Sequence, residues 1–218
     1  PDLNHCKVAI LGLGYVGLPL ALEIAKSKNC LRTNSMINRM VIGFDINLKR
    51  IKELKEGIDK TQEIKNNDLL ETKNLIFTSD PNDLQNADIF IVTVPTPIDK
   101  VKRPDLSLLF SASKTIGEAI NKRKINCINP KLYRSPIIIY ESTVYPGVTE
   151  DECIPVIERY SNLKINESNG FFCGYSPERI NPGDSNHKLT TIKKVTSGST
   201  EETAKWIDNF YGSIIKAG

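Results

Sequence analysis

The sequence predicts a doubly wound α/β fold, with a mostly parallel sheet and helices on both faces. Two observations predict it. Short apolar segments typical of buried strands alternate with amphipathic segments typical of helices along all 218 residues. The first apolar segment, residues 7–11, also runs straight into a G-x-G-x-x-G turn that opens a helix over residues 18–26.

The glycine turn predicts a dinucleotide-binding site in a Rossmann-like fold. Gly12 permits the tight turn, Gly14 lets the backbone approach a pyrophosphate, and Gly17 lets the helix pack close to the strand. Tyr15 and Val16 complete the turn, and the helix N-terminus favours the negative charge of a pyrophosphate. The alternative is a tight strand-to-helix turn without a ligand.

An acidic residue, Asp45, ends the second predicted strand over residues 40–45. In this position a carboxylate binds the adenosine ribose and disfavours a 2′-phosphate, which predicts NAD rather than NADP. Asp45 lies farther from Gly17 than the usual spacing of about 20 residues. A polar segment, residues 29–39, accounts for the excess as a long loop between helix and strand.

The rest of the chain continues the alternation. A helix over residues 46–56, with Leu48, Ile51 and Leu54 on one face, ends at Gly57. Asp80 or Asp83 is predicted to cap a short helix, and Asp105 a long one. Strands are expected over residues 75–78, 88–94, 136–141, 170–175 and 194–196, with a final apolar strand at 213–215; helices are expected over 84–87, 106–122, 149–160 and 200–211.

Composition excludes several classes of protein. The chain is 39% hydrophobic and 25% charged with a net charge of +3, which predicts an ordinary globular protein without a nucleic-acid footprint. No apolar segment is long enough for a membrane span. Five scattered cysteines and two histidines predict no metal site and suit a reducing cytoplasm. We expect the cysteines to be small buried or partly buried side chains.

Three further strands end in unusual residues, and ligands of such sheets bind beyond the carboxyl ends of strands. One end carries Val94, Pro95, Thr96 and Pro97, the next Glu141 to Gly147, and the last Tyr175 to Asn181. Thr143 either donates a hydrogen bond to substrate, nicotinamide or water, or caps a local turn. Glu178 is either a general base or a surface glutamate paired with Arg179. The prolines alone indicate only that the strands end.

Four ordered segments, residues 12–21, 92–99, 141–147 and 174–184, together resemble the UDP-glucose/GDP-mannose dehydrogenase family. The likeness is greatest to its Vi-antigen-type branch, which acts on UDP-N-acetylhexosamines for polysaccharide synthesis. The resemblance implies oxidation of the sugar C6 alcohol to a carboxylate with two NAD⁺, through a cysteine-bound thioester.

The same resemblance implies roles for individual residues. The turn from Gly12 to Gly17 would hold the pyrophosphate, Asp45 the ribose with Arg50 beside it, and Thr143 the catalytic water. Glu178 would be the general acid/base. The remaining implied contacts are Val94, Pro95, Thr96, Pro97 and Ile98 along the cofactor pocket, Ser142 and Val144 by the nicotinamide, and Arg179, Ile180, Asn181 and Pro182 against the UDP-sugar substrate.

The family's catalytic cysteine and most UDP-binding residues lie in a middle helix and a C-terminal domain. None of the five cysteines here stands in that motif. We therefore expect residues 1–218 to be the N-terminal NAD-binding domain, with residues 185–218 as a C-terminal αβ extension. The full-length protein is expected to be a homodimer and this chain alone a monomer. The alternatives are a UDP-glucose or GDP-mannose 6-dehydrogenase and a non-catalytic NAD-binding module.

Overall fold

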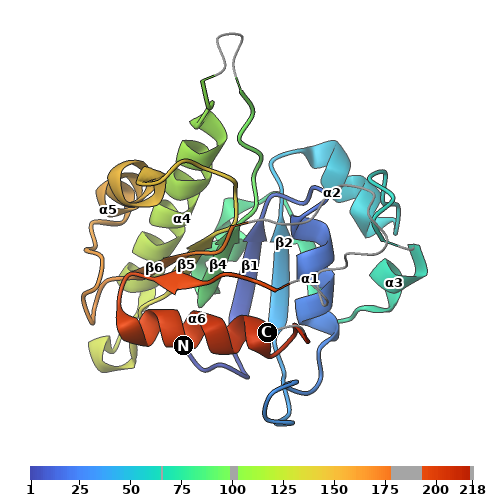
Figure 1. Ribbon diagram of the computed structural model, residues 1–218, viewed down its shortest axis with the longest axis horizontal. Coiled ribbons are helices and arrows are strands. Elements are labelled where there is room, and N and C mark those ends of the chain that lie inside the picture. The colour runs from blue at the N-terminus through green and yellow to red at the C-terminus, as the bar shows by residue number, and fades with distance from the viewer. Residues whose placement is uncertain (65, 99–102, 178–192, 217–218) are drawn as a thin grey trace.

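A computed structural model describes residues 1–64, 66–98, 103–177 and 193–216, and confirms the doubly wound fold. One seven-stranded sheet has the order β3-β2-β1-β4-β5-β6-β7 (Figure 1). Neighbouring strands pair in parallel, except that β7 runs antiparallel to β6. The strands are β1 Lys7–Leu11, β2 Met40–Phe44, β3 Leu75–Thr78, β4 Ile89–Val92, β5 Ile137–Tyr140, β6 Phe172–Tyr175 and β7 Ser197–Gly198.

Helices cover both faces of this sheet. Side chains of α1 and α6 pack in one apolar cluster, and those of α4 and α5 in another on the opposite face. The short helices α2 and α3 lie at the β2–β3 side of the sheet (Figure 1). The helices are α1 Gly17–Lys26, α2 Leu48–Lys55, α3 Asn66–Glu71, α4 Ser107–Asn126, α5 Ile154–Ser161 and α6 Glu201–Gly212.

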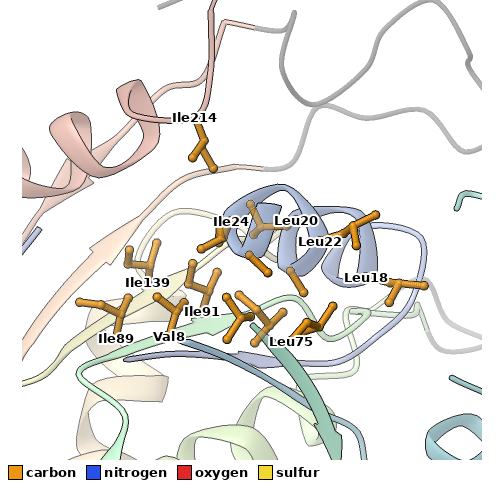
Figure 2. Close-up of a cluster of buried hydrophobic side chains, with 14 of the residues drawn as sticks. Val8, Leu18, Leu20, Leu22, Ile24, Leu75, Ile89, Ile91, Ile139 and Ile214 are labelled. Atoms are coloured by element: carbon orange, nitrogen blue, oxygen red, sulfur yellow. The ribbon is translucent and has the colours of Figure 1, made fainter. Parts of the chain in front are cut away.

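The central strands are apolar because both of their faces are buried, except for the exposed Lys7 at the start of β1. In β1, Val8 and Ile10 belong to the first cluster, whereas Ala9 and Leu11 belong to the second. Figure 2 shows Ile24 of α1 lying over the strand side chains, with Ile214 reaching toward the same cluster. The two clusters together hold the sheet rigidly, so the carboxyl ends of its strands form a fixed platform.

Several boundaries differ from those expected from sequence. Helix α2 begins two residues late because the Asn47 side chain caps it, accepting from the N–H groups of Lys49 and Arg50. Leu48 is consequently 72% exposed, so its assignment to the buried face was wrong. Residues 213–215 form a buried turn rather than a strand, since Ile214 and Ile215 bond back to Tyr211.

Other differences are smaller. The short helix near residue 84 is a 3₁₀-helix, Pro81–Asn86, which Asp80 caps. The helix expected from residue 149 opens with a π-helical segment, Val148–Cys153, before α5. The strand expected at 194–196 is β7, three residues later, and α3 was not expected at all. Four cysteines are buried and Cys127 is partly exposed, as expected.

The segment before β2 is a loop, as expected, but it holds an unexpected buried cation. Arg39 is only 1% exposed, donates from Nε and Nη2 to the Leu3 carbonyl, and donates from Nη1 to Ser213 Oγ. Its guanidinium also stacks 4.6 Å from the centre of the Phe210 ring. Arg39 thus fastens the N-terminal residues and the loop to the end of α6.

None of the helices in the described part of the chain is long and apolar enough to cross a membrane.

Candidate functional site

A cavity of about 970 Å³ opens at the carboxyl ends of the central strands. It lies between β1 and β4, where the strand order reverses: the chain continues from β1 to β2 on one side of this point, and from β4 to β5 on the other. Doubly wound sheets bind their ligands at this point. Residues of α2 and α4 line part of it. Its lining includes most of the predicted cofactor residues: Gly12, Gly14, Tyr15, Val16, Asp45, Arg50, Val94, Pro95, Thr96, Pro97, Ser142 and Thr143.

The three glycines of the turn have three different structural requirements. Gly12 has φ +98°, a backbone conformation that favours glycine. A Cβ on Gly17 would lie 1.9 Å from the Gly12 oxygen, so only glycine lets α1 pack this close. A Cβ on Gly14 would meet nothing within 4 Å. Gly14 is therefore not needed for packing and borders open space in the cavity.

The glycine turn contains backbone N–H groups that donate no hydrogen bond within the described part of the chain. Among the described residues, the backbone N–H groups of Gly14, Tyr15 and Val16 have no hydrogen-bond partner. They stand at the N-terminus of α1, where the helix dipole also favours an anion. The turn itself is fixed by Thr93, whose hydroxyl donates to the carbonyls of Leu11 at 3.1 Å and Gly12 at 2.7 Å. Sequence reasoning missed Thr93.

Asp45 and Arg50 hold the same residue of the turn. The Leu13 N–H donates to Asp45 Oδ2 at 2.9 Å, and the Leu13 carbonyl accepts from Arg50 Nε at 3.0 Å. Asp45 also accepts from the Asn47 N–H at 2.9 Å. The carboxylate and the guanidinium are therefore both fixed at the edge of the cavity, at the carboxyl end of β2.

Two side-chain hydroxyls connect the segments after β4 and β5 through hydrogen bonds. Ser142 Oγ donates to the Val94 carbonyl at 2.6 Å, and Thr96 Oγ1 donates to the Thr143 carbonyl at 2.6 Å. Thr143 itself is exposed, and its own hydroxyl has no hydrogen-bond partner in the described part of the chain. The structure thus leaves the Thr143 hydroxyl available, while that of Ser142 holds the loop.

Next to Ser142 in the chain, Glu141 takes part in a buried ion pair that sequence reasoning also missed. Lys194 Nζ is 2.6 Å from Glu141 Oε2, and the two side chains are 7% and 0% exposed. The Tyr211 hydroxyl donates to the other Glu141 oxygen. Because Glu141 lines the cavity and directly precedes Ser142, this network fixes the β5 end of the site to the C-terminal part of the chain.

We predict that Lys194→Met destabilises the protein strongly, because it removes the cation that lies 2.6 Å from the buried Glu141 carboxylate. The expected loss in the free energy of unfolding is about 3–5 kcal/mol, measured by chemical denaturation. Lys193→Met is the matched control at an exposed neighbouring lysine and should change stability by less than about 0.5 kcal/mol. A loss below about 1 kcal/mol for Lys194→Met would show that the pair is unimportant for the fold.

The predicted residues Glu178, Arg179, Ile180, Asn181 and Pro182 lie outside the described residues. The described strand β6 ends at Tyr175, shortly before them.

Comparison with known proteins supplies the family. Residues 6–215 match the NAD binding domain of the UDP-glucose/GDP-mannose dehydrogenase family. The chain belongs to this family. It is 52% identical to a UDP-N-acetyl-D-glucosamine 6-dehydrogenase of Pseudomonas aeruginosa and 48% identical to one of Salmonella typhi, over 99% of this chain and 45% of each relative.

Solved structures agree with this assignment. The UDP-D-ManNAc dehydrogenase of Pyrococcus horikoshii is 28% identical with a TM-score of 0.75, over 96% of this chain and 45% of that one. The chain therefore spans less than half the length of these relatives. Because the chain matches the NAD-binding domain of the family, its cofactor is NAD. The free N–H groups and the open space at Gly14 fit a pyrophosphate.

Proposed function

We propose that this chain is the cofactor domain of an NAD-dependent UDP-N-acetylhexosamine 6-dehydrogenase. Such an enzyme oxidises the sugar C6 alcohol to a carboxylate with two NAD⁺ and one water. The observation that carries the proposal is one continuous cavity, which runs from Asp45, past the free N–H groups of the glycine turn, to Thr143. The names of the relatives at 52% and 48% identity favour an N-acetylhexosamine over glucose as the sugar.

The cavity suggests how the dinucleotide lies. Its pyrophosphate would meet the N–H groups of Gly14, Tyr15 and Val16, which have no other partner in the described chain. The adenosine ribose would lie by Asp45 and Arg50. The segment from Val94 to Pro97 would line the pocket toward the nicotinamide, which accepts hydride from the sugar when NAD⁺ is bound.

The chemical steps would lie at the opposite end of the cavity. The free Thr143 hydroxyl is suited to hold a water or a substrate oxygen beside the nicotinamide, and Ser142 keeps it in place through Val94. We propose Glu178 as general acid/base, and Arg179, Ile180, Asn181 and Pro182 as substrate contacts, on the family motif alone. These residues follow β6, whose carboxyl end points to the same side of the sheet as those of β4 and β5.

We also propose the place of this domain in the whole enzyme. Residues 1–218 form the NAD-binding domain, with residues 185–218 as its αβ extension, and the sugar-binding half is a separate part of the enzyme. The proposed full-length enzyme is a homodimer. It works in the cytoplasm, a setting that suits five cysteines of which none forms a disulfide.

The choice between NAD and NADP gives a second prediction. Asp45→Asn should narrow the preference for NADH over NADPH by about 10-fold, because it removes a charge that repels the 2′-phosphate. The asparagine oxygen can still accept from the Leu13 N–H, so the turn should persist. Calorimetric titration with both cofactors measures the change. An equal change in both affinities would show that Asp45 does not face the 2′ position.

A chimera tests the function as a whole. Residues 1–218 are joined to the remaining C-terminal part of the Pseudomonas aeruginosa relative, and NADH formation is followed with UDP-N-acetylglucosamine. We expect turnover comparable to that of the relative, lost with Gly14→Val or Glu178→Gln. A folded chimera that binds UDP-sugar but forms no NADH would contradict the proposal.

A further inference from the structure

The guanidinium of Arg50 is only partly used by the protein. Its Nε donates to the Leu13 carbonyl at 3.0 Å, and its Nη2 lies 2.8 Å from Asp59 Oδ1. Its Nη1 is buried and has no partner among the described residues. Arg50 lines the cavity, so its positive charge acts on a molecule that binds there.

The position of Arg50 raises a question of cofactor choice. An arginine close to the acidic residue at this strand end is the device by which related folds accept the 2′-phosphate of NADP. Here Arg50 and Asp45 bind opposite ends of the same residue, Leu13, so both charges stand at the same corner of the cavity. Asp45 would repel a 2′-phosphate, and an unopposed Arg50 would attract it.

Asp59 supplies the opposing charge. Its side chain is fully buried and accepts, in addition to Arg50, from Thr61 N–H and Oγ1 and from the N–H groups of Glu63 and Ile64. Burial alone would raise the pKa of the Asp59 carboxyl, but hydrogen bonds from Thr61 and Arg50 outweigh it and hold the pKa below its usual value. Asp59 is therefore a carboxylate at neutral pH.

The other cations of this corner are more exposed than Arg50. Lys60, with 58% of its side chain exposed, pairs with Glu53, which is 14% exposed, and Lys49 is exposed to solvent. Water and salt screen the two exposed lysines, whereas the pair of Arg50 and Asp59 is largely shielded, with side chains 11% and 0% exposed.

We propose that Asp59 is a specificity-determining residue, which neutralises Arg50 and directs its Nη2 away from a cofactor 2′-phosphate. The corner of the cavity then keeps the negative charge of Asp45. Selection of NAD therefore depends on two carboxylates, of which Asp59 acts through Arg50. This inference rests on the proposed position of the adenosine ribose between Asp45 and Arg50.

Calorimetric titration of the 218-residue chain with NADH and NADPH tests the inference. Asp59→Asn should raise the affinity for NADPH relative to NADH by about 10-fold, because it frees the charge of Arg50. Asp88→Asn is the matched control, since Asp88 is a partly buried carboxylate that pairs with Arg123 at 2.8 Å outside the cavity lining. The control should leave the ratio of affinities unchanged.

The double variant Asp59→Asn/Arg50→Met separates an effect through Arg50 from a direct effect of Asp59. Compared with Arg50→Met alone, it should show no gain for NADPH. A gain that persists without Arg50, or a ratio within twofold of wild type in folded Asp59→Asn, overturns the inference. If circular dichroism shows Asp59→Asn unfolded, Asp59→Ser removes the same charge and the same criteria apply. A wild-type chain that binds neither cofactor overturns the proposed cofactor site as well.

Discussion

The 218-residue chain on its own should bind NADH and yet show no sustained oxidation of UDP-sugars. The proposed two-step oxidation needs a thiol that holds the aldehyde and then the acyl group, and none of the five cysteines stands in the family's catalytic motif. Burial raises the pKa of Cys6 and Cys153 to about 11, which opposes formation of a reactive thiolate at these two positions.

The expected rate is lower than that of the chimera by about 10³-fold or more, because both the nucleophile and most substrate contacts are missing. NADH absorbance with UDP-N-acetylglucosamine, UDP-N-acetylgalactosamine and UDP-glucose measures it. Turnover by the chain alone that is lost on substituting one of its own cysteines would place the catalytic thiol within residues 1–218 and contradict this expectation.

Gly14→Val should lower the affinity for NADH by at least about 100-fold without unfolding the protein. A valine side chain here would meet no protein atom within 4 Å of its Cβ, but would fill the space in front of the free N–H groups. Calorimetry measures the binding, and circular dichroism with thermal unfolding measures the fold.

Gly17→Val is the matched variant at the other end of the turn. Its Cβ would lie 1.9 Å from the Gly12 oxygen and 2.4 Å from Thr93 Oγ1, so it should damage the fold itself. Two glycines of one motif thus have different requirements, one for the ligand and one for packing. Normal NADH affinity in Gly14→Val would mean that the dinucleotide does not pass over Gly14.

The sequence was sufficient for the parts of the fold that depend on local pattern. Strands such as β4 and β5 are continuous apolar runs because helices cover both of their faces, and the glycine turn has a fixed spacing. These local signals also placed the turn, Asp45 and Thr143 around one cavity. Periodicity failed at Leu48, which follows the helical pattern but lies in the first turn of α2, where the helix has not yet reached the core.

The residues that were missed act through distant partners. Lys194 meets Glu141 across 53 positions of sequence, and Arg39 meets Ser213 across 174. Asp59 lies in a polar loop, where an aspartate ordinarily indicates a turn. Its importance follows only from its contact with Arg50, which the folding of that loop against α2 creates. No local pattern distinguishes such a residue from a solvated surface charge.

Calorimetric titration of the wild-type chain with NADH and with NADPH tests the central claim most directly. We predict that NADH binds in a one-to-one complex, and more tightly than NADPH by about 10- to 100-fold, because the adenosine corner carries the charge of Asp45 while Asp59 neutralises Arg50. Absence of NADH binding by the folded chain, or an equal affinity for the two cofactors, would contradict this account of the site.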